Sequence, residues 1–412
     1  MTGKEFFKVT SLENIYDLIG TFPPVGEEII PLDRSLGRIL TRDTISEINL
    51  PEFTRATMDG YAVGARSTFG ASESMPAVLS VVGSVAMGEI PGVSARSGEA
   101  VRIATGGMLP EGTDSVVMVE HTQALDEHTI ECFRSVAPLQ NVIEIGEDIR
   151  KGEKILSKGT RIRPQEMGVL AALGQSRVPV YRQPVAAIIS SGDEIVPIEE
   201  TPGLSQLRDV NAHTLTGLVK LSGGIPLYLG IARDNFDEVN RLLQRALARA
   251  DMVLISGGSS VGSRDLTLDV IRGLPDSEIL AHGVSISPGK PTILARIKEK
   301  PIWGLPGQVT SAMVVFHMMV RRSLERIGGL SEEKLGKLQE VDALLSRNLA
   351  SVQGREDYIR IKLVQKGEHL YAEPLLGKSG LIHTMVKADG LIRIDRNSEG
   401  LERNSPVKVI LL

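Results

Sequence analysis

The stretch DMVLISGGSSVGSRD, residues 251–265, decides the fold class of this 412-residue chain. Its first residues are largely apolar and predict a buried strand, and a turn rich in glycine and serine follows. Gly257 and Gly262 have the spacing of a phosphate-binding P-loop, but Ser263 and Arg264 stand where that loop has lysine and then serine or threonine. The stretch therefore predicts a strand–turn–helix unit whose anion site draws its countercharge from elsewhere.

Outward from this unit, apolar strands and helical segments alternate over residues 179–330. PVAAII (184–189) and IPLYLGIA (225–232) predict strands, whereas 211–224 and 236–250 have a helical period. Continuous apolar strands separated by helices are typical of a doubly wound parallel sheet that is covered on both faces. Further strands are predicted in KPTILARI (290–297) and KPIWGL (300–305), and one closing helix is predicted over 309–327.

The regions that flank this α/β domain predict a multidomain subunit. Residues 51–141 are rich in valine, glycine and serine between turn signals, which favours a β-rich inserted domain. Residues 331–412 contain the alternating run DYIRIKLV (357–364), and we expect a small barrel or sandwich there. The remaining segments, 1–50 and 142–178, form a discontinuous N-terminal linker or dimerisation domain.

The composition excludes several classes of protein. A net charge of −5 argues against a nucleic-acid binder, which carries a basic face. One cysteine, Cys132, allows no intrachain disulfide and is typical of a reducing compartment. The N-terminus lacks an apolar export signal, and the most apolar run, 312–320, is far shorter than the ~20 residues of a membrane span. We expect a soluble, cytoplasmic protein with no membrane partner, and His317 packed in a helix rather than bound to a ligand.

An anion site is predicted at the edge of the sheet. In an open parallel sheet, ligands bind beyond the carboxyl ends of the strands, where glycine-rich turns let free N–H groups approach a phosphate. Lys290 in SPGKP (287–291) adds a positive charge. One ion pair at ~4 Å gives a gross attraction of about 4 kcal/mol, and desolvation removes much of it, so one lysine alone binds a polyanion weakly. The predicted substrate-phosphate contacts are Gly257, Gly258, Ser259 and Gly262 of the turn, and Pro306 and Gly307 of GLPGQVTS (304–311).

Five acidic residues follow strands on the same rim and repel a phosphate unless a cation lies between them. Mg²⁺ takes one or two carboxylates together with phosphate oxygens and water, so the rim predicts a magnesium site. The alternative is that several of these acids are helix N-caps, which is a common role of aspartate. Asp265 fits this alternative well. The five acids are Asp193, Glu194, Asp209, Asp234 and Asp265.

Eight motifs occur in an order and spacing that resemble one known family. They are MDGYA (58–62), RIATGGMLPEGTDSVVMVE (102–120), IGEDIRKGE (145–153), SSGDEIV (190–196), GGSSVGSRD (257–265), SPGKP (287–291), GLPGQVTS (304–311) and GREDYIR (354–360). Over nearly its whole length the chain resembles the molybdopterin molybdenumtransferases, which include MoeA and the E domain of gephyrin.

The resemblance implies an elongated four-domain subunit, with the α/β domain, the β-rich domain and a C-terminal small β-barrel, that assembles as a homodimer. It implies a reaction of molybdate with adenylylated molybdopterin that releases AMP in the presence of Mg²⁺ and leaves molybdenum on the dithiolene. An upstream molybdopterin adenylyltransferase is the implied source of the substrate. The active site is expected between the α/β domain of one subunit and the N- and C-terminal β domains of the other.

Roles are carried over to residues that match the family's motifs. Catalytic roles are implied for Glu194, Asp59, Asp148 and Thr105, of which the last three belong to the neighbouring chain's side of the cleft. Glu194, Asp234 and Asp265 are implied metal ligands, and Asp234 also lies near the nucleotide. Molybdate is a tetrahedral dianion that suits the donor fork of arginine, a lysine and two hydroxyls. The implied oxyanion residues are Lys290, Arg355, Ser379 and Ser311.

The chain departs from the family around this anion site. Ser287 stands where the family has the first lysine of KPGKP, Gln308 and Val309 replace the Asn-Pro of GLPGNPVS, and GGSS replaces GGVS. We hypothesise that Arg264 or Lys378 restores the missing charge. The residues do not separate molybdate from tungstate as the natural anion.

Two rival functions are disfavoured. A nucleotide-dependent oxidoreductase has a GxGxxG turn that opens a βαβ unit, with an acidic residue ~20 positions further, and the chain lacks this pattern. A non-catalytic pterin-binding scaffold has no need of a charged cleft, whereas this chain keeps Asp59, Glu194, Asp265, Lys290 and Arg355.

Overall fold

The computed structural model describes residues 9–257 and 263–412, and for 263–265 it describes the backbone only. Contacts divide the chain into two compact units. Unit 1 comprises Met1–Arg42, Lys158–Arg163 and Arg177–Leu412, and unit 2 comprises Asp43–Ser157 and Pro164–Ser176. The predicted α/β domain, β-rich domain and small barrel are all confirmed. No helix in the described ranges is long and apolar enough to cross a membrane.

A six-stranded sheet forms the centre of the α/β domain in unit 1, in the order β16–β13–β17–β21–β20–β18. The first four strands are parallel, as predicted, and the runs of buried residues in β13, β17 and β21 fit a sheet covered on both faces, whereas β16 at the edge is only partly buried. The bounds are β13 (Val185–Ser191), β16 (Ile225–Ala232), β17 (Met252–Gly257), β18 (Ser277–His282), β20 (Ile293–Ile297) and β21 (Lys300–Pro306).

Two strands at one side of this sheet differ from the predicted all-parallel pattern. β20 pairs antiparallel with β21, and β18, which the sequence did not indicate, pairs antiparallel with β20. Only two residues separate Ile297 from its partner Lys300, and Lys298 has a φ of +55°. A loop of two residues joins antiparallel strands, because a parallel crossover needs a dozen or more residues.

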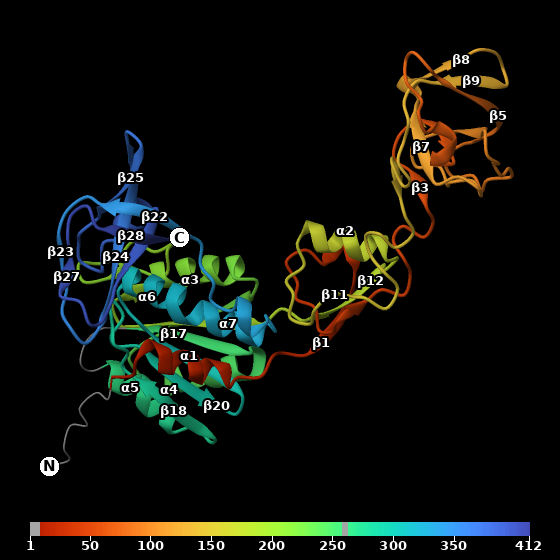
Figure 1. Ribbon diagram of the computed structural model, residues 1–412. Coiled ribbons are helices and arrows are strands. Elements are labelled where there is room, and N and C mark those ends of the chain that lie inside the picture. The colour runs from red at the N-terminus through yellow and green to blue at the C-terminus, as the bar shows by residue number, and fades with distance from the viewer. Residues whose placement is uncertain (1–8, 258–262) are drawn as a thin grey trace. The chain divides into compact units, whose positions relative to one another are not determined.

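Helices cover both faces of the sheet through separate apolar clusters. One cluster joins α1, α3, α6 and α7 to the sheet, and the other joins α4 and α5. In Figure 1, α3, α6 and α7 lie on one side of β17, and α4 and α5 lie on the other. The bounds are α1 (Leu12–Gly20), α3 (Val210–Leu221), α4 (Phe236–Arg249), α5 (Ser263–Arg272), α6 (Val309–Val315) and α7 (Arg321–Ile327).

The predicted closing helix over 309–327 contains a π-helical turn, η4 (Phe316–Val320), between α6 and α7. His317 lies in this turn, packed against the edge of Phe316. Burial, with a smaller contribution from the positive charge of Arg321, lowers the pKa of the His317 imidazole to about 4. The expectation that His317 is packed in a helix agrees with this environment.

The C-terminal part of unit 1 is a closed barrel, which decides between the barrel and the sandwich that the sequence left open. The ring runs β24–β25–β22–β28–β26 and closes because β24 also pairs with β26. A short strand of the α/β domain, β19 (Ile286–Ser287), adds to β24 in parallel. The bounds are β22 (Glu340–Leu345), β24 (Glu356–Lys366), β25 (His369–Pro374), β26 (Gly390–Ile394) and β28 (Pro406–Leu411), with β23 (Leu349–Ala350) paired to β27 (Gly400–Leu401) and a short helix α8 (His383–Val386).

Unit 2 contains a six-stranded sheet in the order β7–β4–β6–β5–β9–β8. The β4 backbone packs so closely on β7 that a Cβ at Gly60 would lie 1.9 Å from the Val117 carbonyl oxygen, so only glycine fits there. The bounds are β4 (Gly60–Val63), β5 (Ala77–Val85), β6 (Glu99–Ile103), β7 (Ser115–Met118), β8 (Thr122–Ala124) and β9 (Thr129–Cys132), with the pairs β2 (Thr44–Ile45) and β11 (Lys154–Leu156), β3 (Arg55–Ala56) and β10 (Val142–Ile143), and helix α2 (Pro164–Ala172).

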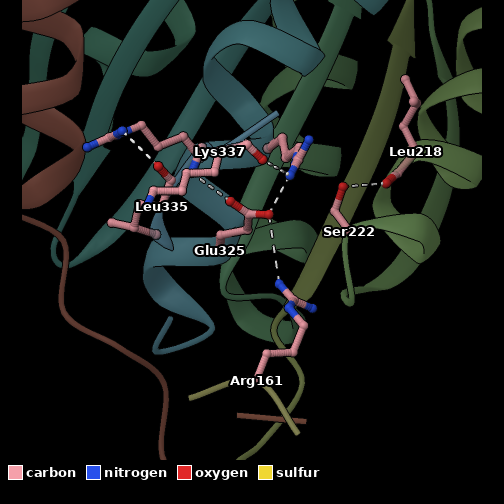
Figure 2. A network of polar contacts seen from close by, with 9 residues as sticks. Arg161, Leu218, Ser222, Glu325, Leu335 and Lys337 are labelled. Carbon is pink, nitrogen blue, oxygen red and sulfur yellow. Dashed lines mark hydrogen bonds and ion pairs between the residues drawn. The ribbon is translucent and has the colours of Figure 1, made fainter. Parts of the chain in front are cut away.

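A buried glutamate joins segments of unit 1 that are distant in sequence (Figure 2). Glu325 on α7 is 4% exposed and accepts from the Arg321 side chain at 3.0 Å and from the Gly336 N–H at 2.9 Å. Arg161, from the segment Lys158–Arg163, lies 3.8 Å from the same carboxylate. Strand β1 (Glu27–Pro31) pairs with β12 (Arg177–Tyr181) to tie further distant segments of unit 1 together.

We predict that Glu325→Gln lowers the free energy of unfolding of unit 1 by about 2 kcal/mol, because two partly buried arginines lose their countercharge. Trp303 is the only tryptophan and is fully buried in this unit, so its fluorescence in urea reports the transition. The control Glu332→Gln removes an exposed carboxylate that pairs with Arg322 and should cost less than about 1 kcal/mol. Equal losses in both variants would contradict the prediction.

Candidate functional site

The parallel strands of unit 1 end side by side and bring their loops to one edge of the sheet. Ser191, Gly257 and Pro306 end β13, β17 and β21, and the strand register pairs Ser191 with Gly257 and Gly257 with Pro306. The end of β17, the loops after β13 and β21, the start of α3 and a barrel segment line a cavity of about 470 Å³, here called the Glu194 cavity. Its lining includes the predicted residues Glu194, Gly257 and Gly307, together with Ser190, Asn211, Ser256, Gln308 and Ile382.

Glu194 owes its position to the glycine two residues before it. Gly192 has a φ of +146°, and a Cβ there would lie 2.7 Å from Glu194 Oε2, so the half-buried carboxylate can fold back over the loop only because position 192 lacks a side chain. The backbone of the loop is tied to the short strand β15 (Leu207–Arg208), since Leu207 N–H donates to the Glu194 carbonyl at 2.7 Å. This arrangement places an acidic side chain inside the cavity.

The other described acids of the rim have different environments. Asp234 accepts from Ser191 Oγ at 3.2 Å, and its N–H donates to Asp193 Oδ1 at 3.2 Å, so both carboxylates lie by the ends of β13 and β16. Asp209 is a helix cap, as the alternative held, because its carboxylate accepts from the Ala212 N–H at 3.0 Å at the start of α3. Its other oxygen accepts from Tyr228 at 2.9 Å, and burial and the Asp209 charge raise the pKa of that phenol.

A second hollow, of about 400 Å³, gathers all four residues predicted to hold the oxyanion. Lys290, Ser311, Arg355 and Ser379 line it together, although they are separated by as many as 89 positions (379 − 290). Ser287 and Pro306 also line this anion pocket. Gln308 lines both the anion pocket and the Glu194 cavity, so the two hollows are neighbours.

Local backbone geometry positions the lysine. A Cβ at Gly289 (φ +123°) would lie 2.7 Å from the Val315 side chain, so the SPGKP turn requires glycine to pack against α6. Thr292 Oγ1 donates to the Gly289 carbonyl at 2.7 Å, and Val284 N–H donates to the Lys290 carbonyl at 2.9 Å. Lys290 itself is exposed toward the pocket that it lines.

The barrel side of the anion pocket is held by a buried carboxylate and by α6. Arg355 Nε lies 3.0 Å from Asp357 Oδ1, and Asp357 is 5% exposed, so the ion pair leaves the two terminal nitrogens of the guanidinium for a ligand. The Ser379 carbonyl accepts from both the N–H (3.1 Å) and the hydroxyl (2.6 Å) of Thr310. Two domains of one chain therefore meet in this pocket.

This arrangement corrects one expectation from the sequence. The C-terminal domain was expected to reach the α/β domain from the other subunit, but Arg355 and Ser379 line the pocket beside Lys290 of the same chain. The reason is local: the parallel pairing of β19 with β24 places Ser287 opposite Asp357 within the chain.

Unit 2 holds the predicted residues Asp59, Thr105 and Asp148. Asp59 Oδ1 accepts from the N–H and the hydroxyl of Thr105, at 2.6 and 2.8 Å, and these hydrogen bonds lower the pKa of the Asp59 carboxyl. Asp148 is exposed, and its N–H donates to the Leu50 carbonyl at 3.0 Å. The exposed Asp59–Thr105 pair is thus an ionised carboxylate held in a fixed orientation.

Some predicted residues lie outside the described part of the chain. Gly258, Ser259 and Gly262 are not described, and neither are the side chains of Arg264 and Asp265. Among the described residues, no three His, Cys, Asp or Glu side chains gather closely enough to hold a metal ion by themselves. One or two carboxylates per locus fit a magnesium ion that is shared with substrate phosphate rather than caged by protein.

Three polar residues of the cavity were not predicted as site residues. Ser190, Ser256 and Asn211 are 2%, 3% and 9% exposed, and each has a side-chain oxygen with no hydrogen-bond partner among the described residues. A signal was present in the sequence, because each serine ends an apolar strand run, in AAIIS and VLIS, just before a glycine-containing turn.

Comparison with known proteins places this geometry in a family. The chain matches the family models MoeA N-terminal region (domain I and II) over residues 10–174, probable molybdopterin binding domain over 187–326, and MoeA C-terminal region (domain IV) over 342–412. It is 34% identical to the molybdopterin molybdenumtransferase of Haemophilus influenzae, over 82% of this chain and 81% of that protein. The chain belongs to the molybdopterin molybdenumtransferase family.

Other relatives of the family agree over greater length. A putative molybdopterin biosynthesis protein of Methanocaldococcus jannaschii is 35% identical over 93% of this chain and 92% of its own length. The crystal structure of the molybdopterin biosynthesis MoeA protein of Pyrococcus horikoshii covers 98% of this chain and 99% of its own, with 37% identity and a TM-score of 0.81. Family membership makes the chain an enzyme, a transferase of molybdenum cofactor biosynthesis.

We predict that Arg355→Gln and Lys290→Gln each weaken binding of inorganic molybdate by about 10- to 100-fold, because each removes a charge-assisted hydrogen bond from the anion pocket. Isothermal titration calorimetry measures the affinity. Lys387→Gln, which removes an exposed charge that does not line the pocket, is the matched control and should bind as the wild type does. Wild-type affinity in both pocket variants would refute the assignment.

Proposed function

We propose that the protein inserts molybdenum from molybdate into adenylylated molybdopterin and releases AMP. The observation that carries this proposal is the adjacency of two hollows in one chain: an anion pocket lined by Lys290, Arg355, Ser311 and Ser379, and a larger cavity that contains Glu194. One is suited to a small tetrahedral dianion, and the other has room for an organic substrate.

In the proposed mechanism, the backbone N–H groups of Gly257 and Gly307 contact the substrate phosphates at the end of the sheet, beside Pro306. Gly258, Ser259 and Gly262, which lie outside the described residues, are proposed for the same role. Lys290 and Arg355 neutralise the oxyanion, and the hydroxyls of Ser311 and Ser379 donate to its oxygens. Glu194 accepts a proton from a water molecule whose oxygen attacks the adenylyl phosphorus, and the anhydride P–O bond breaks to give AMP and the pterin phosphate.

Mg²⁺ belongs to the same proposal. When bound, it supplies positive charge to the diphosphate, and Asp234, Glu194 and Asp265 are the acids proposed to hold it. Asp234 also approaches the nucleotide. The Ser191 hydroxyl that donates to Asp234 keeps this carboxylate oriented at the end of β13.

The proposed assembly is a homodimer in the cytoplasm, in which Asp59, Thr105 and Asp148 of unit 2 serve the cleft of the partner subunit. The fixed, ionised Asp59 suits a role in orienting a bound group. The proposed partners are molybdate, adenylylated molybdopterin and the upstream molybdopterin adenylyltransferase, with no nucleic acid and no membrane. Tungstate remains the alternative anion, because its size and charge match those of molybdate.

We predict that the purified protein releases AMP from adenylylated molybdopterin only when Mg²⁺ and molybdate are both present. Glu194→Gln should lower the rate of AMP release by about 100-fold or more, because it removes the proposed base. Glu199→Gln, an exposed acid of the same loop region, is the control and should retain the wild-type rate. Liquid chromatography quantifies AMP.

Metal insertion by Glu194→Gln at the wild-type rate would favour the scaffold function. Preference for tungstate in a competition assay would change the assigned anion.

A separate prediction concerns the charge missing at Ser287. If Arg264 or Lys378 restores it, Arg264→Ala or Lys378→Ala should weaken molybdate binding about tenfold, while the variant Ser287→Lys should recover the loss. Lys378 is exposed and precedes Ser379 of the anion pocket, which supports its candidacy. Calorimetric titration with molybdate measures the affinities. Wild-type affinity in both alanine variants would exclude the hypothesis.

A further inference from the structure

The inner wall of the Glu194 cavity carries buried polar atoms that the described protein does not satisfy. Ser190 Oγ, Ser256 Oγ and Asn211 Oδ1 each lack a hydrogen-bond partner among the described residues, and all three residues line the cavity. Each residue is at least nine-tenths buried. A buried polar atom without a partner costs free energy, so its retention at a cavity wall points to a ligand that supplies the partner.

The fold holds these three residues side by side. Ser190 and Ser256 are directly paired in the register of the neighbouring parallel strands β13 and β17, one position before the strands end. Asn211 lies at the start of α3, where its amide Nδ2 donates to the Gly307 carbonyl at 2.9 Å. That hydrogen bond fixes the orientation of the amide, so Oδ1 is left as an acceptor of fixed direction.

The chemistry of the three atoms indicates the kind of group that they bind. Asn211 Oδ1 can only accept, and it therefore needs an N–H or O–H from the ligand, whereas the two serine hydroxyls can donate or accept. The cavity also has apolar lining from Ile195, Val309 and Ile382. Apolar walls around a few fixed polar groups are typical of a site for a flat heterocycle with a hydrogen-bonding edge.

We propose that Ser190, Ser256 and Asn211 form a recognition edge for the N–H-bearing ring of the substrate. Asn211 Oδ1 accepts from a ring N–H or an exocyclic amino group, and the serine hydroxyls bind the adjoining donor and acceptor atoms. This inference rests on the proposed function and deepens it. Both the pterin and the adenine of the proposed substrate carry such an edge, and the test below distinguishes them.

The serines allow a test in which stability and binding move independently. Because neither hydroxyl has a hydrogen-bond partner in the part of the chain that the structure describes, Ser190→Ala and Ser256→Ala should leave the melting temperature of the ligand-free protein unchanged or raise it. Ser35→Ala is the matched control: Ser35 is fully buried, and its hydroxyl donates to the Leu32 carbonyl at 2.7 Å, so this variant should melt at a lower temperature and bind as the wild type does.

Binding is measured by calorimetry with three probes: AMP, 6-hydroxymethylpterin phosphate, and ribose 5-phosphate, which has no ring edge. The double variant Ser190→Ala/Ser256→Ala should lose about 5- to 20-fold affinity for whichever ring occupies the cavity and should bind ribose 5-phosphate unchanged. Loss for AMP alone assigns the adenine, and loss for the pterin alone assigns the pterin. Asn211→Ala should lower both affinity and stability, because it also breaks the hydrogen bond to Gly307.

Unchanged affinity of the double variant for both ring-bearing probes overturns the inference, and so does a wild type that binds neither of them. AMP release from adenylylated molybdopterin, assayed in parallel, separates the two proposals. Turnover with an unchanged KM in the double variant refutes the recognition edge and leaves the proposed function standing. Ring binding that depends on the serines, without any turnover, refutes the proposed function and leaves the recognition edge standing.

Discussion

Strands β13, β17 and β21 run parallel, and their register pairs Ser191 with Gly257 and Gly257 with Pro306. Because three strands end at one level, Ser190, Glu194, Ser256, Gly257 and Gly307 come together to line one cavity. The pairing also sets Ser190 beside Ser256 one step deeper in the same two strands. A shift of one residue in either strand would turn these hydroxyls to the opposite face of the sheet, so the whole polar wall depends on backbone hydrogen bonds.

The anion pocket depends in turn on the attachment of the barrel to the α/β domain. Strand β19 adds to β24 in parallel, and Thr310 at the start of α6 donates twice to the Ser379 carbonyl. These contacts set Lys290 and Ser311 on one side of the pocket and Arg355 and Ser379 on the other. Arg355 Nε lies 3.0 Å from Asp357 Oδ1, so the charge of a buried carboxylate favours this position of the guanidinium.

Hydrophobic periodicity was sufficient to predict the strands and helices that have long, regular patterns, such as α4, β17 and β24. It missed features that depend on other forces. The antiparallel edge strands follow from the loop of two residues before Lys300, and the π-turn around His317 interrupts a pattern that reads as one helix. Barrel closure depends on pairing between β24 and β26, which are distant in sequence and leave no periodic signal.

For the site, the four residues that gather in the anion pocket were predicted from the resemblance of their motifs to those of the family. Ser190, Ser256 and Asn211 were missed: each serine ends an apolar strand run in the sequence, but only the three-dimensional structure shows that the side-chain oxygens of all three residues lack a partner among the described residues. The placement of Arg355 beside Lys290 of the same chain also needed the structure, because sequence spacing does not tell intrachain from intersubunit contact.

The principal apolar cluster of unit 1 contains Leu12, Ile15 and Ile19 from the first helix and Ile410 from the last strand. A ribosome delivers these residues almost 400 positions apart (410 − 12 = 398), with the strands of unit 2 made in between. The first helix, α1, contacts α7 (Arg321–Ile327), so it lacks these native partners until residue 327 has been synthesised. Completion of this core is a late event of synthesis. For most of its time on the ribosome, the nascent chain exposes the apolar face of its first helix.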